Sequence, residues 1–241
     1  MILADKVLLI TGGGSGVGAA IAQVCAREGA RVVVTGRDET KLKSVCDAIG
    51  DSAASFAADV TDRPRVEELV QWVIGEYGCI DVLVNNAGVN VVDRSLDKLT
   101  PENWDLQMDT NVTGAFNLIH FVLPHMRRRR EGLIISISSL AGIHPSVLAG
   151  TAYSASKHGM SVLTKMIDLE EAANGIRATV ISPGEINTPI LDQRPVKVSD
   201  EHKARILQPE DIGKAVLYVA SLPPRVCIPE MLIKPLEQGS V

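Results

Sequence analysis

The chain has 241 residues, and an α/β chain of this length commonly folds as one unit. With 46% hydrophobic and 22% charged residues it has the composition of a globular protein, which excludes a disordered chain, a collagen-like repeat and a disulfide-stapled miniprotein. The formal charge of -5 and the scarcity of aromatic side chains argue against nucleic acid as a partner.

Apolar runs rich in β-branched residues alternate with stretches of helical apolar spacing. The runs predict strands at 7–11, 31–35, 55–58, 82–85, 133–138 and 178–182, with a last one at 231–234, and the stretches between them include helices at 17–28 and 65–77. Strands that alternate with helices are expected to be parallel and to be covered on both faces. The sequence therefore predicts one doubly wound parallel sheet over residues 1–241, in which the irregular stretch 185–208 forms a substrate loop or lid.

A glycine-rich turn follows the first predicted strand and opens the first helix. Its sequence is Thr11-Gly-Gly-Gly-Ser-Gly-Val-Gly18. Glycines at this place let the backbone approach a diphosphate, which the free amides of the helix end bind, although a tight turn also needs glycine for conformational reasons alone. Ala19 and Ala20 replace the Lys-Ser/Thr of a nucleoside-triphosphate loop, so the turn favours a Rossmann-like dinucleotide site.

Tyr153 and Lys157 stand four residues apart in a predicted helix. At this spacing the two side chains project from one helix face, and an ammonium beside a phenol is expected to lower the pKa of the phenol. Such a pair also occurs by chance on a solvated helix face. It gains interest because Ser138 and Ser139 end a predicted strand shortly before it, at the edge where open α/β sheets bind ligands.

These features resemble the short-chain dehydrogenase/reductase family over nearly the whole chain. The matching motifs, in order, are Thr11-Gly12-x-x-x-Gly16-x-Gly18, Asp59, Asn85-Asn86-Ala87-Gly88, Asn111, Ser139, Tyr153-x-x-x-Lys157 and Pro183-Gly184. The resemblance implies a single Rossmann-like domain and an NAD(P)-dependent oxidoreductase. The end of the chain lacks the Asp-Gly-Gly pattern of many members, and it resembles a branch of alcohol and hydroxy-acid dehydrogenases that act on small polar substrates.

The resemblance assigns roles to the catalytic residues. Tyr153 would exchange a proton with the substrate oxygen while a hydride moves to or from the nicotinamide, and Ser139 would orient that oxygen. Lys157 would lower the tyrosine pKa and hold the nicotinamide ribose, and Asn111 would help a proton-relay water. Ser138 could face the site in place of Ser139, because adjacent strand residues point in opposite directions.

The resemblance also implies the cofactor contacts. They are Gly12, Ser15, Gly16, Val17, Gly18, Arg37, Asp59, Val60, Asn86, Ala87, Gly88, Tyr153, Lys157, Pro183, Gly184, Ile186 and Thr188. Two of them have a structural alternative: Asn86 could brace the turn after its strand, and Thr188 could cap a helix before Pro189.

Two patterns at the end of the second strand disagree about the cofactor. Asp38 stands 20 residues beyond Gly18, where an acidic residue favours NAD. Alignment of the second strand with that of the family instead places Gly36 at the acid position and Arg37 next to it, as in members that prefer NADP. Because a guanidinium binds a phosphate through paired hydrogen bonds, we expect NADP, with NAD second; Arg37 could also only cap a turn.

Other features favour a protein without a metal or a membrane segment. The four cysteines form no Cys-x-x-Cys pair, the five histidines show no metal spacing, and the first residues lack a signal-peptide pattern. We expect a cytoplasmic protein. The four arginines 127–130 suit the end of a helix better than a nucleic-acid site.

The leading functional prediction is an NADP-dependent oxidoreductase of a small alcohol or carbonyl substrate. The alternatives are a 3-oxoacyl reductase and a nucleotide-binding regulator without catalysis. The lid carries both basic and acidic residues, so the sequence does not decide whether a carrier-bound substrate could dock there. A homodimer or homotetramer is expected, because family members usually pair through the last strand and the helix before it.

Overall fold

The computed structural model describes residues 1–194 and 197–238. Seven parallel strands form one sheet in the order β3-β2-β1-β4-β5-β6-β7. The strands are β1 (Val7–Thr11), β2 (Arg31–Gly36), β3 (Ala53–Ala57), β4 (Val82–Asn85), β5 (Gly132–Ile137), β6 (Ile176–Pro183) and β7 (Glu230–Ile233). The predicted doubly wound parallel sheet is confirmed.

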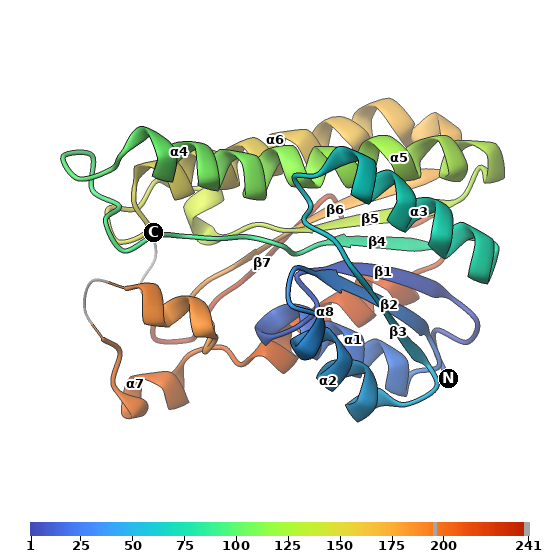
Figure 1. The fold of residues 1–241 in the computed structure, drawn as a ribbon, viewed down its shortest axis with the longest axis horizontal. Helices are drawn as coiled ribbons and strands as arrows, with labels where there is room; N and C mark the ends of the chain where they lie inside the picture. The colour runs from blue at the N-terminus through green and yellow to red at the C-terminus, as the bar shows by residue number, and fades with distance from the viewer. Residues whose placement is uncertain (195–196, 239–241) are drawn as a thin grey trace.

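Helices cover both faces of the sheet (Figure 1). One face carries α1 (Gly16–Arg27), α2 (Glu39–Ile49) and α8 (Pro209–Ser221), and the other carries α3 (Arg63–Tyr77), α4 (Pro101–Met108), α5 (Gly114–Arg129) and α6 (Thr151–Glu171). The short elements are η1 (Asp109–Thr113), η2 (Leu140–Gly142), η3 (Ala172–Asn174), η4 (Pro189–Gln193) and α7 (Asp200–Arg205). No helix in the described part of the chain is long and apolar enough to span a membrane.

The strand residues divide between two cores, one on each side of the sheet. Leu8 and Ile10 of β1 pack into the core beneath α1 and α8, whereas Val7 and Leu9 pack into the core beneath α3 and α5. This division follows from the two-residue period of a strand. β1 and β4 are buried along their whole length, which explains their continuous apolar runs.

The predicted strand limits hold best in the centre of the sheet. β1 and β4 have the predicted bounds, whereas β3 begins two residues earlier than the prediction and ends one residue earlier. β3 is an edge strand with partly exposed side chains, so its hydrophobic pattern is weaker than that of a central strand.

The stretch predicted as an irregular lid contains regular structure. It holds η4 and α7, and Ile186 forms an isolated parallel bridge with Leu207. Positions 195 and 196 of this stretch lie outside the described residues. The stretch follows β6, so it begins at the carboxyl edge of the sheet.

Candidate active site

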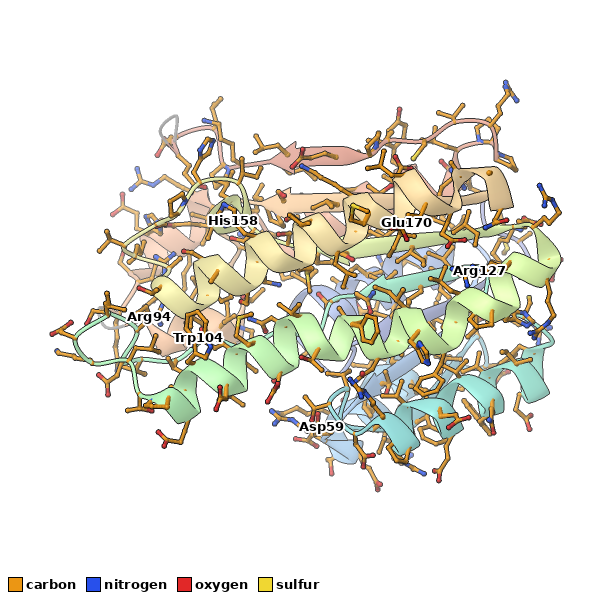
Figure 2. All side chains as sticks on the ribbon, turned by 90° about the horizontal axis from the view of Figure 1, so that it is seen from above. Asp59, Arg94, Trp104, Arg127, His158 and Glu170 are labelled. Carbon is orange, nitrogen blue, oxygen red and sulfur yellow. The ribbon has the colours of Figure 1, made fainter. Side chains whose placement is uncertain are left out.

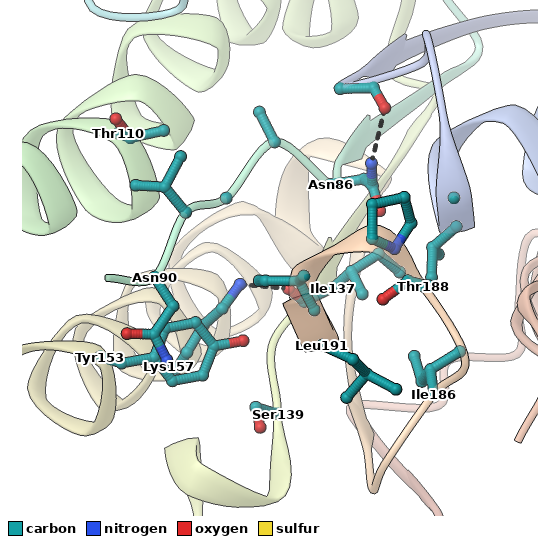
Figure 3. A pocket seen from close by; sticks show the side chains of 18 of the residues that line it. Asn86, Asn90, Thr110, Ile137, Ser139, Tyr153, Lys157, Ile186, Thr188 and Leu191 are labelled. Atoms are coloured by element: carbon teal, nitrogen blue, oxygen red, sulfur yellow. Dashed lines mark hydrogen bonds between the residues drawn. The ribbon is translucent and has the colours of Figure 1, made fainter. Parts of the chain in front are cut away.

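A cavity of about 1000 Å³ opens at the carboxyl ends of the strands. Loops after β1, β2, β4, β5 and β6 supply its wall, and Figure 3 shows Ser139, Tyr153, Lys157 and Thr188 around it. Every residue of the predicted site lines this cavity except Gly18 and Asn111. The cavity therefore lies at the edge of the sheet where the sequence motifs were expected to meet.

The glycine-rich turn presents the start of α1 to the cavity. Gly12 and Gly16 have positive φ angles of 64° and 53°, which favour glycine. The side chain of Ser15 makes no capping hydrogen bond, and the first turn of α1 contains no acidic residue. By contrast, Asp38 and Asp62 cap α2 and α3. The start of α1 thus suits an anionic group such as a dinucleotide diphosphate.

Gly18 supports this turn from behind. A Cβ atom at Gly18 would lie 2.3 Å from the carbonyl oxygen of Gly12 and 2.6 Å from Nδ2 of Asn86. The residue therefore allows the close packing of α1 against the loop, and it does not itself form the cavity wall.

Asn86 braces the turn, as the structural alternative predicts, and it also lines the cavity. Its Nδ2 donates to the carbonyl oxygens of Thr11, at 2.8 Å, and Gly12, at 3.3 Å. Oγ1 of Thr11 accepts from the backbone N–H groups of Asn86 and Ala87, both at 2.9 Å. These bonds join the loops after β1 and β4.

Arg37 and Asp38, the residues that gave opposite predictions of the cofactor, lie just after the end of β2. A Cβ at Gly36 would meet only one atom, Cδ2 of Leu42 at 3.7 Å, so the space beside it is open. The guanidinium of Arg37 is 66% exposed and lies 4.0 Å from the carboxylate of Asp59. The carboxylate of Asp38 instead accepts from the backbone N–H of Lys41 at 3.1 Å, and this bond helps to hold its pKa below the usual value.

Ser139, Tyr153 and Lys157 line the same part of the cavity (Figure 3). Nζ of Lys157 lies 5.7 Å from the centroid of the Tyr153 ring and donates to the carbonyl oxygen of Ile137 at 2.8 Å. Ser138 is buried, and its Oγ donates to the carbonyl oxygen of Lys157 at 3.1 Å. Ser139, with its partly exposed side chain beside Tyr153, is the better placed of the two serines to meet a ligand.

The prediction that the pKa of Tyr153 is lowered is wrong. Burial raises the pKa of Tyr153 to about 12, and the Ser139 hydroxyl and the Arg94 charge oppose this increase only in part. Burial also lowers the pKa of Lys157 to about 8. Loss of hydration at both groups outweighs the attraction that the helix spacing suggested.

Asn111 lies just behind the cavity wall, in the π-helical turn η1, and is buried. Its Oδ1 accepts from the backbone N–H of Val89 at 2.8 Å, while Nδ2 donates to the carbonyl oxygen of Val89 and to Oγ of Ser156. A Cβ at Gly88 would lie 3.3 Å from both Oδ1 of Asn111 and Nζ of Lys157, so the amide is near the lysine.

The segment after β6 closes the opposite side of the cavity. Pro183, Gly184, Ile186 and Thr188 all line it. Thr188 stands before η4, but its hydroxyl makes no capping hydrogen bond, and its Cγ2 would be 3.4 Å from a Cβ at Gly16. Thr188 thus faces the start of α1, and its hydroxyl is not used to cap η4.

The cavity wall includes residues that the sequence analysis did not single out. They are chiefly Lys41, Asn90, Arg94 and Gln238. Lys41 and Arg94 follow the ends of β2 and β4 in sequence. Their positions shortly after strand ends could have identified them as candidates for the cavity wall. Gln238 is far from the motifs in sequence, and its Oε1 accepts from the backbone N–H of Glu185 at 3.0 Å. The described residues contain no cluster of three or more metal-ligating side chains.

Comparison with known proteins identifies the family of the chain. The family model described as short chain dehydrogenase matches residues 6–198. The chain belongs to the short-chain dehydrogenase family. An uncharacterized oxidoreductase of Staphylococcus saprophyticus is 36% identical over 238 residues, which cover 97% of this chain and 99% of that protein.

Two solved structures show the same fold with a bound cofactor. A serine dehydrogenase complexed with NADP+ has a TM-score of 0.89 and 31% identity, with 98% of this chain and 97% of that one covered. A 3-ketoacyl-(acyl-carrier-protein) reductase from Brucella melitensis, complexed with NADH, has a TM-score of 0.89 and 28% identity, with 96% and 98% covered. The chain is an NAD(P)-dependent oxidoreductase of this family.

Proposed function

We propose that the protein transfers a hydride between NADP(H) and a small alcohol or carbonyl substrate, with Tyr153 as the acid and base. The observation that carries this proposal is the meeting of Ser139, Tyr153 and Lys157 in the cavity that the glycine-rich turn also lines. A regulator that binds a nucleotide without catalysis would have no need of this arrangement.

The cofactor would extend along the carboxyl edge from β2 to β6. The start of α1 would bind its diphosphate, Asp59 and Val60 would lie beside the adenine, and the backbone of residues 86–88 would run along it. Pro183, Gly184, Ile186 and Thr188 would enclose the nicotinamide. When bound, the cofactor supplies or accepts the hydride.

The residues of this chain would manage the proton. In reduction, the hydroxyl of Tyr153 would donate its proton to the carbonyl oxygen of the substrate, and the hydroxyl of Ser139 would donate a hydrogen bond to the same oxygen. Because burial raises the pKa of Tyr153 to about 12, the phenol carries this proton at neutral pH. The ammonium of Lys157 would hold the ribose hydroxyls. In oxidation it would stabilise the phenolate form of Tyr153, which accepts the proton of the substrate hydroxyl.

The residues at the end of β2 favour NADP over NAD as the cofactor. The 2′-phosphate would enter the open space beside Gly36, between the cationic side chains of Arg37 and Lys41, which both line the cavity. Asp38 also lines the cavity, but its Oδ1 caps α2 and its Oδ2 lies 3.5 Å from Nζ of Lys41, so both oxygens already have partners.

A 3-oxoacyl reductase is the second candidate, because such an enzyme is among the similar structures. A carrier-bound substrate would call for available cations near the entrance. Arg194 instead pairs with Glu185, and Arg205 pairs with Glu201 and Glu237. These ion pairs favour a small free substrate.

A dimer or tetramer is also proposed, because exposed apolar side chains form a stripe along α6. On α6, Val162, Met166 and Leu169 are 61%, 42% and 76% exposed and repeat at the spacing of one helix face. Phe116 of α5 and Leu232 of β7 are exposed as well. Pairing with a second copy would cover such surfaces.

A screen of oxidation and reduction tests the proposal. Small hydroxy acids, sugars and ketones are offered with NADP(H) and with NAD(H), and cofactor absorbance is followed. We expect turnover with NADP(H), and we expect Tyr153→Phe to lose at least about 100-fold in kcat while it still binds cofactor. Turnover by the Phe variant at more than about a tenth of the wild-type kcat would contradict the role of Tyr153.

A further inference from the structure

Residues 234–238, which follow β7 and are called the tail below, pack against the wall of the cavity. Because β7 pairs with β6, Ile233 lies beside Pro183, and the carbonyl oxygen of Ile233 accepts from the backbone N–H of Gly184 at 2.7 Å. The tail leaves β7 at this point, which is the carboxyl edge of the sheet, and its residue Gln238 lines the cavity.

The tail folds back on itself and so holds the backbone of Gln238 in place. The backbone N–H of Gln238 donates to the carbonyl oxygen of Pro235 at 3.1 Å, and Nζ of Lys234 donates to the carbonyl oxygen of Gln238 at 2.7 Å. Pro235 is buried, and its ring restricts the backbone at the start of this turn.

The side chain of Gln238 contacts the turn that follows β6. Its Oε1 accepts from the backbone N–H of Glu185 at 3.0 Å. A Cβ at Gly184 would overlap Oε1 of Gln238 and would lie 2.8 Å from Cδ of Pro235. The tail can therefore pack on this turn because residue 184 is a glycine.

Glu185 is also held by more distant residues of the lid. Its carbonyl oxygen accepts from the backbone N–H of Leu207 at 3.1 Å, and its carboxylate contacts Arg194 and His202. Glu185 lines the cavity, as do the two residues before it. This part of the cavity wall is thus fixed between the lid and the tail.

We propose that Gln238 is a positioning residue for the nicotinamide end of the cofactor site. By accepting from Glu185, it holds residues 183–185 in the conformation that encloses the nicotinamide. A wall that is already held in its binding conformation has less freedom to lose when the ligand arrives, which strengthens binding. The inference rests on the proposed function, which puts the nicotinamide against Pro183 and Gly184.

The distance between the two ends of the cofactor site provides a test. Asp59, which would lie beside the adenine, follows β3, whereas the tail follows β7, and these are the two outer strands of the sheet. Figure 2 shows Asp59 on the opposite side of the molecule from β7, the red strand. A ligand that has the adenosine half of the cofactor and no nicotinamide should therefore not depend on Gln238.

Gln238→Met keeps the length of the side chain and removes the acceptor oxygen. Calorimetry measures the binding of NADP+ and of adenosine 2′,5′-bisphosphate, which carries the adenosine and its 2′-phosphate without the nicotinamide. We expect the Kd of NADP+ to rise about 3- to 10-fold, as the loss of one hydrogen bond would give, and the Kd of the bisphosphate to stay the same. Gln238→Glu keeps an oxygen at this position and should bind both ligands as the wild type does.

Hydrogen exchange in the cofactor-free protein measures the hydrogen bond itself. Peptides that contain residues 183–188 should exchange faster in Gln238→Met than in the wild type, because the N–H of Glu185 loses its acceptor. Gln71→Met is the matched control, since Gln71 is exposed on α3, where its Nε2 donates to Glu67, and it does not line the cavity. This variant should leave the exchange of these peptides and both Kd values unchanged.

The outcomes separate this role from the proposed reaction. An unchanged Kd of NADP+ in Gln238→Met, an equal loss with both ligands, or unchanged exchange at residues 183–188 overturns the positioning role. A loss confined to NADP+, with faster exchange, supports it even if no substrate is turned over, and the failure then lies with the proposed reaction. A wild type that binds neither NADP+ nor NAD+ overturns the proposed function and this role with it.

Discussion

At the residue scale, burial shifts the pKa values of the two central side chains of the cavity, Tyr153 and Lys157. Tyr153 and Lys157 share a helix face, and their spacing alone suggested a phenol with a lowered pKa. The surroundings of each group reverse this expectation, because burial removes hydration from both. Nζ of Lys157 contacts Ile137 and Met160, and Tyr153 lies against the cavity wall. The sequence could locate the pair, but not its electrostatics, because burial depends on residues that are distant in the chain.

The buried ammonium of Lys157 predicts a pH dependence of stability. The folded pKa of about 8 is below the usual 10.5, so the wild type gains free energy of unfolding as the pH rises from about 8 to 10.5. Lys157→Met removes this dependence. We expect the free energy of unfolding of the variant, relative to the wild type, to be about 3 kcal/mol higher near pH 7 than near pH 10.

Urea unfolding of the cofactor-free protein at the two pH values measures this difference. The loss of the hydrogen bond to Ile137 changes the stability equally at both, so it cancels from the comparison. Lys43→Met is the control, since the Lys43 side chain is 75% exposed on α2. An equal stability difference at the two pH values would show that the ammonium is not penalised by burial.

Arg37 predicts which cofactor is preferred. Its guanidinium would pair with a phosphate that only NADP carries, so Arg37→Ala should raise KM for NADPH at least about tenfold and change KM for NADH little. Steady-state kinetics with both cofactors measure this. An equal loss with both cofactors, or a wild type that prefers NADH, would contradict this role and favour Asp38 as the ribose ligand, with Arg37 only capping a turn.

At the scale of elements, the sequence predicted the central strands better than the connections. β1 and β4 are buried on both faces, so their apolar runs end where burial ends, and the predicted bounds are confirmed. The stretch 185–208 looked irregular because η4 and α7 are too short for a helical period to be visible. The π-helical turn around Asn111 was also missed, because an i to i+5 turn leaves no pattern of its own in the sequence.

The packing of α1 against its loop predicts a sharp effect at Gly18. A methyl group there would lie 2.3 Å from a backbone oxygen, so Gly18→Ala must displace the loop or the helix. We expect a loss of about 1–3 kcal/mol in stability and weaker binding of both NADP and NAD. Thermal unfolding and cofactor titration measure the two effects.

Gly75→Ala is the matched control for this substitution. Gly75 is an exposed glycine in α3, and a Cβ there would meet no atom within 4 Å. Because alanine favours a helix over glycine, this variant should be more stable by up to about 1 kcal/mol and should bind both cofactors as the wild type does. If Gly18→Ala were as harmless as Gly75→Ala, the close packing of α1 would not matter for the site.

At the scale of the whole molecule, one edge of the sheet collects the motifs, and this was predictable. Parallel strands place their carboxyl ends together, so Gly12, Asn86, Ser139 and Pro183 had to meet there once the strands were assigned. The positions of Arg94 and Gln238 were not predictable, because the first depends on how a loop packs on α6 and the second on how the tail crosses Gly184.

The outer faces of the molecule predict how it assembles. Leu169 ends the apolar stripe of α6 and is 76% exposed, which is costly unless a second copy covers it. We expect the wild type to be a dimer or a tetramer, and we expect Leu169→Glu to weaken the assembly because a carboxylate would lose its hydration in the interface.

Leu96, which is also 76% exposed but lies on the loop before α4, provides the control Leu96→Glu. Light scattering after size exclusion gives the mass of each protein at several concentrations. A monomeric wild type, or equal behaviour of the two Glu variants, would show that the stripe of α6 is not an interface.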